Sequence, residues 1–195
     1  MSTDRFADRR AALLGRLDET IAIIPAGREQ TRNDDVAHPF RQGSDFYFLT
    51  GFTEPDAVAV LDATSDQPFV LFVRPRDPEK EAWNGRRAGV EGAQARFGAD
   101  AAFELDELDG WLRRRLAGRR SVAYTLGGRL DPAVLRAIGS VKAYASRSGV
   151  DAPVEIVDLA TLVAELRVIK SPTEIEALRE ACRISAIAHI EAMRF

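Results

Sequence analysis

The chain has 195 residues, of which 46% are hydrophobic, enough to bury the core of one full domain and to leave a further fragment. Its 27 basic and 30 acidic residues give a formal net charge of −3, so no long-range field favours a polyanion and no nucleic-acid partner is expected. A single cysteine, a charged start and the lack of any apolar run of about 18 residues argue against an intrachain disulfide, a secretory leader and a membrane span, so we expect a cytoplasmic protein.

The first half of the chain predicts one helix and then strands. Apolar residues at near-helical spacing within residues 6–17 indicate an amphipathic helix. Short and almost wholly apolar runs at 20–24, 57–61 and 69–73 are typical of strands covered on both faces. Because the link between the last two is too short for a helical crossover, we expect them to form an antiparallel hairpin in a mixed sheet.

The second half alternates strands with helices. Strands are expected at 122–126 and 154–157. Asp131 is expected to be the N-cap of a helix with Pro132 at its first position. The inward residues of that helix and of the one after the last strand are predicted to be Val134, Leu135, Ile138 and Val141, then Leu159, Leu162, Val163 and Leu166. Residues 146–153 are the one predicted flexible insertion, and the whole pattern predicts an α/β domain whose mixed β-sheet is flanked by helices.

Two local patterns concern helix ends. The arginines at 113–115 and 119–120 follow a predicted helix, so we expect them to form a solvated terminus that complements the helix dipole. Ser171, Pro172 and Glu174 form a capping box that starts the last helix. The expected inner face of this helix consists of Ile175, Leu178, Cys182, Ala186 and His189. The helix reaches Phe195 without a capping glycine, so we expect the chain to stop inside a longer protein.

Chemistry-bearing patterns are sparse. No HExxH helix or GxSxG elbow occurs, and Gly127 and Gly128 do not extend to a nucleotide-binding glycine motif. The two histidines lie in different predicted elements: His38 is expected to anchor a loop or lie on the surface, and His189 to be a hydrogen-bonded packing residue. Cys182 is expected to be a small buried hydrophobe. The sequence therefore predicts no catalytic residue and no metal ligand in this chain.

Residues 32–57, RNDDVAHPFRQGSDFYFLTGFTEPDA, strongly resemble the N-terminal domain of the aminopeptidase P family. Residues 72–78, FVRPRDP, and 83–89, WNGRRAG, agree with that resemblance. The stretch LRVIKSPTEI at 166–175 is similar to the start of the creatinase/prolidase "pita-bread" catalytic domain. The resemblance implies an N-terminal domain at 1–165, then a linker and the first helix of a truncated pita-bread domain at 166–195.

Members of this family are metallo-aminopeptidases (Xaa-Pro aminopeptidases), which remove an N-terminal residue that precedes proline. They use two divalent metals, often manganese, held by two Asp, one His and two Glu of the pita-bread domain. The resemblance places all five ligands after Phe195, so this chain should be inactive alone and should serve oligomerisation, as a dimer or tetramer, and substrate access. Two alternatives stay open: a non-catalytic, peptidase-like module that binds a protein partner, and a relative of the prolidase or creatinase type.

The motif around Pro39 suits a structural role. Pro39 favours an extended backbone, and Ser44 or Asp45 can cap a short helix. Arg41 and Gln42 can tie backbone carbonyls across a loop. These hydrogen bonds would anchor the motif rather than perform catalysis.

Trp83 is the candidate for substrate access. The resemblance implies that its loop can approach a neighbouring subunit's substrate cleft, where the indole would form a wall for a proline ring. A tryptophan half-buried in its own domain is the alternative. His38 stands where the family commonly has tyrosine, which puts the aromatic contact at that position in doubt.

Overall fold

The computed structural model describes residues 4–195, so residues 1–3 of the expected first domain lie outside it. The chain divides into two compact units, Met1–Val163 and Ala164–Phe195. Within residues 4–195, every helix is too short or too polar to cross a membrane.

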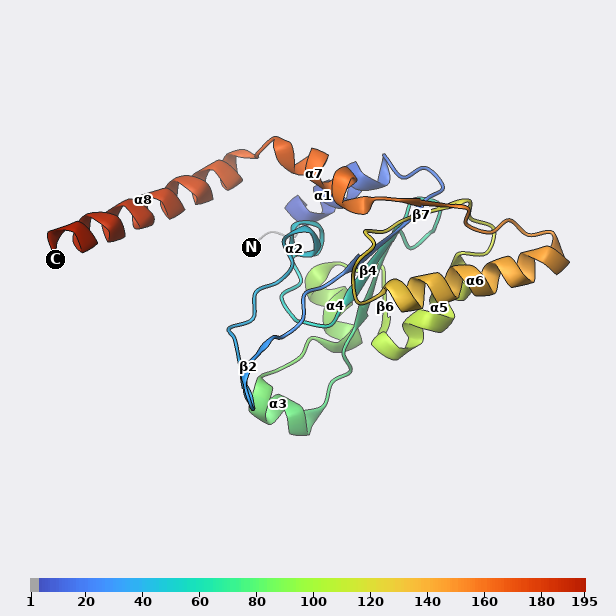
Figure 1. Ribbon diagram of the computed structural model, residues 1–195, viewed down its shortest axis with the longest axis horizontal. Coiled ribbons are helices and arrows are strands. Elements are labelled where there is room, and N and C mark those ends of the chain that lie inside the picture. Colours follow the sequence, from blue (N-terminus) through green and yellow to red (C-terminus); the bar gives the residue numbers. More distant parts are fainter. Residues whose placement is uncertain (1–3) are drawn as a thin grey trace. The chain divides into compact units, whose positions relative to one another are not determined.

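The larger unit is built on a mixed sheet (Figure 1). Its strands are β1 (Ile21–Pro25), β4 (Val58–Asp62), β5 (Phe69–Val73), β6 (Ala101–Glu104), β7 (Ser121–Ala123) and β8 (Glu155–Val157). They lie in the order β6-β5-β4-β1-β7-β8, and β4 alone runs against its neighbours. The predicted hairpin is confirmed, because β4 pairs antiparallel with β5 from Val58 opposite Phe72 to Leu61 opposite Phe69.

Helices cover both faces of this sheet. The helices of the unit are α1 (Asp4–Leu14), α2 (Ser44–Thr50), α3 (Pro78–Asn84), α4 (Gly89–Phe97), α5 (Leu108–Arg115), α6 (Asp131–Ser148) and the first half of α7 (Leu159–Val168). On one face Ile23, Val60 and Phe72 pack against buried residues of α5 and α6. On the other, α1 contacts β4 and α2 contacts β1. Every residue of β4 and β5 is buried, and all of them except Asp62 are apolar, as expected for strands covered on both faces.

Three expectations for the second half are wrong in detail. The N-cap of α6 is Leu130, with Asp131 one position inside the helix. Leu135 is half-exposed, and Ala137 completes the inner stripe of Val134, Ile138 and Val141, because positions three, four and seven apart share a helix face. The predicted insertion is helical only in its first three residues: α6 continues to Ser148 and ends where Gly149 adopts a φ of 70°.

Strand ends and short elements also differ from expectation. β7 stops at Ala123, and Leu126 is exposed. The predicted last strand is confirmed as β8, an exposed edge strand that begins at Glu155. The sequence patterns did not predict α3, α4, β6 or the small hairpin of β2 (Thr31–Asn33) and β3 (Val36–Ala37).

The arginine run lies at the end of α5 as predicted, but it is not simply solvated. Arg115 Nε and Arg119 Nη2 contact the same carboxylate oxygen, Oδ2 of Asp62, at 3.2 and 3.0 Å. The side chain of Asp62 is only 3% exposed. A buried carboxylate needs partners, and the arginine run supplies two of them.

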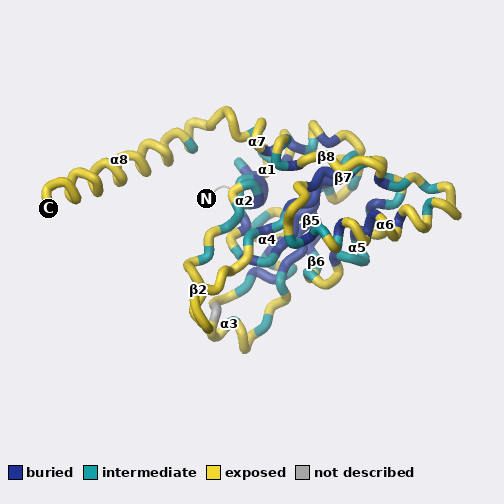
Figure 2. The backbone as a smooth tube through the Cα atoms, viewed as in Figure 1, coloured by how far each residue is buried: buried dark blue, intermediate teal, exposed yellow. Residues whose placement is uncertain are grey.

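The smaller unit contains the end of α7 and the helix α8 (Pro172–Arg194). The capping box is confirmed, because the amide of Ser171 donates to Glu174 Oε2 at 2.8 Å and the Ser171 hydroxyl accepts from the amide of Glu174. The expected inner face of α8 is wrong for this chain, since none of its residues, as described, is buried (Figure 2). Cys182 is therefore exposed, and His189 Nδ1 lies 2.8 Å from the carbonyl oxygen of Ser185 in the same helix.

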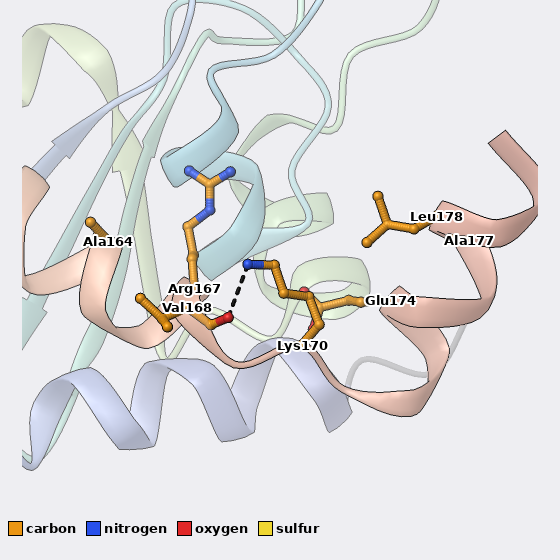
Figure 3. A pocket seen from close by; sticks show the side chains of 7 residues that line it. All are labelled: Ala164, Arg167, Val168, Lys170, Glu174, Ala177 and Leu178. Atoms are coloured by element: carbon orange, nitrogen blue, oxygen red, sulfur yellow. Dashed lines mark hydrogen bonds between the residues drawn. The ribbon is translucent and has the colours of Figure 1, made fainter. Parts of the chain in front are cut away.

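A pocket of about 490 Å³ lies in the elbow between α7 and α8 (Figure 3). Ala164, Val168 and Leu178 give it apolar walls. Lys170 Nζ donates to the carbonyl of Val168 at 3.0 Å, which satisfies a carbonyl left free at the end of α7. The polar groups of this elbow thus stabilise helix ends.

Candidate functional site

The motif residues and Trp83 both belong to segments that leave one edge of the sheet. β1 ends at Pro25, which pairs with Val58, the first residue of β4. β5 ends at Val73 near the same position, because Phe72 also pairs with Val58. The segments 26–57 and 74–89 therefore start or end at the carboxyl edge of the parallel strands, the edge at which α/β sheets commonly bind ligands.

Residues 38–44 form what we call the Gln42 loop, which is held by one side chain. Gln42 Oε1 accepts from the amides of Gly27 at 2.7 Å and Gly43 at 2.9 Å. Its Nε2 donates to the carbonyls of Phe52 at 3.2 Å and Glu54 at 2.8 Å. Gln42 thus makes the hydrogen bonds to backbone carbonyls that the sequence predicts, and it adds two to backbone amides.

A glycine makes this close approach possible. A Cβ added to Gly27 would lie 3.2 Å from the amide nitrogen of Gly43 and 3.3 Å from Gln42 Oε1. Both contacts are tighter than side chains normally make, so a larger residue would push the loop away from β1. The Gln42 loop is therefore packed directly on the chain that leaves the sheet.

Two other expectations for this motif, capping by Ser44 or Asp45 and a backbone contact by Arg41, are wrong. The N-cap of α2 is Gly43, so neither Ser44 nor Asp45 occupies the capping position. Ser44 is instead the first helical residue, and Asp45 lies in the first turn, where a negative charge favours the helix dipole. Arg41 is exposed, and its side chain makes no hydrogen bond or ion pair with any residue in the described range 4–195. Pro39 and His38 are exposed as well.

Trp83 lies on α3, a helix with a well-defined start. The carboxylate of Asp77 accepts from the amide of Lys80 at 3.2 Å, and Pro78 occupies the first helical position. Arg76 forms a two-pronged ion pair with Glu81, with both nitrogen–oxygen distances 3.1 Å. The indole of Trp83 is 89% exposed, so the alternative of a half-buried tryptophan is wrong for this chain.

The acidic residues of α3 are shifted toward their charged forms. The hydrogen bond from the amide of Lys80 is the largest cause that lowers the pKa of Asp77, and the hydrogen bond from Arg76 is the largest that lowers the pKa of Glu81. The same contact with Glu81 raises the pKa of Arg76. Arg76 is exposed but the side chain of Glu81 is only 9% exposed, so this ion pair ties α3 to the segment that precedes it.

The base of the α3 segment is tied to the sheet edge. Arg87 Nη1 donates to the carbonyl of Pro75 at 3.0 Å, which joins the two ends of the segment. Gly89 has a φ of 63°, and a Cβ there would lie 2.6 Å from Arg76 Cγ. The segment from 75 to 89 is therefore a closed loop that carries Trp83 outward.

Glu54 joins the two regions, and the sequence reasoning assigned it no role. Its carbonyl accepts from Gln42, and its side-chain Oε1 accepts from the amide of Ala88 at 2.6 Å. Its Oε2 lies 3.9 Å from Arg74 Nη2, and the side chain is only 17% exposed. The signal in the sequence was an acidic residue in the same motif as Gln42, placed just before a strand that is buried throughout.

The described residues do not fit a metal centre. Nowhere in residues 4–195 do three or more His, Cys, Asp or Glu side chains come together in a way that could hold an ion. His38 belongs to the Gln42 loop and His189 to α8.

Known proteins are similar to this chain over most or nearly all of its length. The family model described as "Aminopeptidase P, N-terminal domain" matches residues 6–124. The chain is 38% identical to the Xaa-Pro aminopeptidase of Escherichia coli over 99% of its own length and 45% of that protein. It is 30% identical to Xaa-Pro aminopeptidase 3 of Homo sapiens, over 90% of this chain and 35% of that one. The chain thus spans less than half the length of these relatives.

Solved structures agree with this similarity. The aminopeptidase PepP of Pseudomonas aeruginosa superposes with a TM-score of 0.92 at 41% identity, over 99% of this chain and 44% of that one. A zinc-substituted Escherichia coli aminopeptidase P in complex with product gives a TM-score of 0.89 at 38% identity, over 97% and 44%. The mixed sheet flanked by helices is therefore the fold of these proteins over the matched part.

Proposed function

The chain belongs to the aminopeptidase P N-terminal domain family, and from this premise we propose that it is the accessory domain of an Xaa-Pro aminopeptidase. The complete protein would remove the N-terminal residue that precedes proline in a peptide. This domain would assemble the enzyme as a homo-oligomer and shape access to the substrate cleft of a neighbouring subunit. The hydrolytic chemistry, with two divalent metals that we propose to be manganese, would reside in a further domain of the complete protein.

The exposure of Trp83 on an anchored helix carries this proposal. A large apolar ring that is 89% exposed leaves much of its surface in water, a cost that is recovered when the ring is covered by a partner. Tryptophan is also the residue type most enriched at interaction hot spots. A flat indole suits one wall of a cleft that receives a proline ring.

The order of the surrounding segment supports the same role. The Arg76–Glu81 ion pair, the Asp77 cap and the Glu54–Ala88 hydrogen bond each restrict the path of residues 75–89. A side chain that is ordered before it meets its partner loses less conformational entropy on contact. The backbone that carries Trp83 is thus ordered before a partner binds.

The test is to replace Trp83 by alanine in the complete protein and to assay a peptide with proline in second place, with manganese. We expect kcat/KM to fall about tenfold or more with unchanged thermal stability, as for the loss of an interaction worth about 1.4 kcal/mol. Arg86→Ala is the matched control, because Arg86 is also exposed in the same segment. Equal kinetics for Trp83→Ala and the original protein would remove Trp83 from the site.

The division of labour needs a separate assay. The 195-residue chain alone, supplied with manganese and the same peptide, should release no amino acid. Hydrolysis by this chain would contradict the accessory role. If the complete protein were also inactive but bound a protein partner through the Trp83 face, the non-catalytic module would be the better description.

A further inference from the structure

A pocket of about 340 Å³ opens beside the Gln42 loop. One side is formed by Gly27, Arg28 and Gln30 as the chain leaves β1, and the other by the Gln42 loop itself. The hydrogen bonds from Gln42 to Gly27 and Gly43 join these two sides. The pocket is therefore a built feature of the fold, with both walls held by the same side chain.

The charged and titratable residues that line it are cationic or neutral. Arg28, Arg41 and His38 belong to the lining, and no aspartate or glutamate in the described part of the chain does. Arg41 has no ion-pair partner among residues 4–195. The lining thus carries two permanent positive charges, and neither is neutralised from within the pocket.

One donor of Arg28 already has an acidic partner. Arg28 Nε lies 3.4 Å from Asp56 Oδ1, with the two side chains 66% and 31% exposed. The charges of this pair also act on Arg129: burial is the largest influence and lowers the pKa of Arg129, the charge of Asp56 raises it and the charge of Arg28 lowers it. The contact with Asp56 is made at Nε, and a guanidinium carries five N–H donors, so Arg28 keeps donors for another anion.

The remaining walls indicate the shape of that anion. Pro39 and Phe40 line the pocket beside Arg41. The side-chain amide of Gln42 is fully engaged with the backbone, so recognition there must come from the arginines. A planar carboxylate matches the donor geometry of a guanidinium, and an apolar wall favours an organic body over a bare inorganic ion.

We propose that this Arg28–Arg41 pocket binds the carboxylate of a small organic ligand, with the ligand's apolar part against Pro39 and Phe40. The carboxylate comes from a free organic acid or from the C terminus of a short peptide. The proposal stands on the pocket of this chain and does not depend on the proposed peptidase role.

The experiment titrates the isotope-labelled 195-residue chain, followed by the NMR signals of arginine Nε–H groups and of the Gly43 and Ser44 amides. The probes are propionate and N-acetyl-alanyl-alanine, the primary amides in which each carboxylate is replaced, and inorganic phosphate. We expect saturable binding of the two carboxylates and binding at least about tenfold weaker for the amides, as for the loss of charge-assisted hydrogen bonds. Tighter binding of the peptide identifies a peptide C terminus as the source, and tighter binding of propionate a free acid.

Variants locate the site. Arg28→Ala and Arg41→Ala should each weaken binding about tenfold. Arg32→Ala removes the same charge from an exposed position on β2 outside the pocket and should change the affinity less than about twofold. Unchanged amide spectra outside the pocket show that each variant is folded. Three results would overturn the proposal: no saturable binding of either carboxylate, phosphate or amides bound as tightly, or an equal loss in Arg32→Ala.

Discussion

The charged side chains at the two ends of strand β4 differ in how far they are buried. At its carboxyl end, Asp62 accepts from the amide and hydroxyl of Thr64 at 3.0 and 2.8 Å and contacts Arg115 and Arg119. Its side chain is 3% exposed. Before its amino end, Asp56 pairs with Arg28 in the open, and Glu54 binds the backbone of a segment that extends into solvent.

This difference distinguishes charged groups that stabilise the fold from charged groups that are exposed to a binding partner. The Asp62 cluster is closed, because both carboxylate oxygens are used and the side chains of Asp62 and Arg119 are largely removed from water. The other end exposes Arg28, Arg41 and Trp83 on segments that are nevertheless tied down. Ordered but uncovered side chains are the usual property of binding surfaces on a rigid scaffold.

The strongest test of the contrast removes the buried carboxylate. Asp62→Ala leaves Arg119 largely buried beside an empty site and should lower the free energy of unfolding by about 3–5 kcal/mol. Urea denaturation measures this change. Asp66→Ala, in the exposed turn of the same hairpin, is the control and should cost less than about 0.5 kcal/mol. Similar losses for both variants would show that the Asp62 cluster is not a closed ionic core.

Glu54 offers the next largest effect. Glu54→Ala leaves the amide of Ala88 without its acceptor and should cost about 1–3 kcal/mol. Hydrogen exchange should become faster from 78 to 88 and stay unchanged in the Asp62 cluster. Glu54→Gln keeps an oxygen acceptor and should restore most of the protection. If the two variants exchange alike, the link from Glu54 to the Trp83 segment carries no stability.

Acid should loosen the Trp83 helix before it reaches the core. The pKa values of Asp77 and Glu81 are lowered in the folded chain, so their contributions are present above the unfolded pKa values, near about 4, and are lost as the pH falls through the folded ones. Amide exchange in residues 78–84 should therefore rise below about pH 4. The double variant Asp77→Asn, Glu81→Gln should lose this dependence, and an unchanged pH profile would assign it elsewhere.

The smallest effect is expected at Trp83 itself. Trp83→Ala should change the free energy of unfolding by less than about 0.5 kcal/mol, because the ring is exposed. Trp111→Ala is the matched comparison: that ring lies 5.4 Å from Phe72 in the core, and its loss should cost about 3 kcal/mol. A large cost at Trp83 would mean that its ring is packed and not available to a partner.

Sequence reasoning did best where the signal was local. The β4–β5 hairpin, the capping box at Ser171 and the N-terminal helix follow from apolar periodicity, a short turn and cap residues within a few positions of each other. It did worse where partners lie far apart. Arg119 meets Asp62 across 57 positions and Ala88 meets Glu54 across 34, and no spacing rule reports such pairs.

The amino-acid sequence alone determined the mixed α/β fold, the family and the motif that contains Gln42, because buried strands and backbone-anchoring side chains need particular residue types at particular places. The tertiary structure decided which charged side chains are buried and paired and which are exposed. It showed that Trp83 is exposed on an anchored helix, that Glu54 connects it to the Gln42 loop, and that α8 has an apolar face without cover in the described chain. Exposure depends on what the rest of the chain places against a residue, and that is a property of the packed molecule.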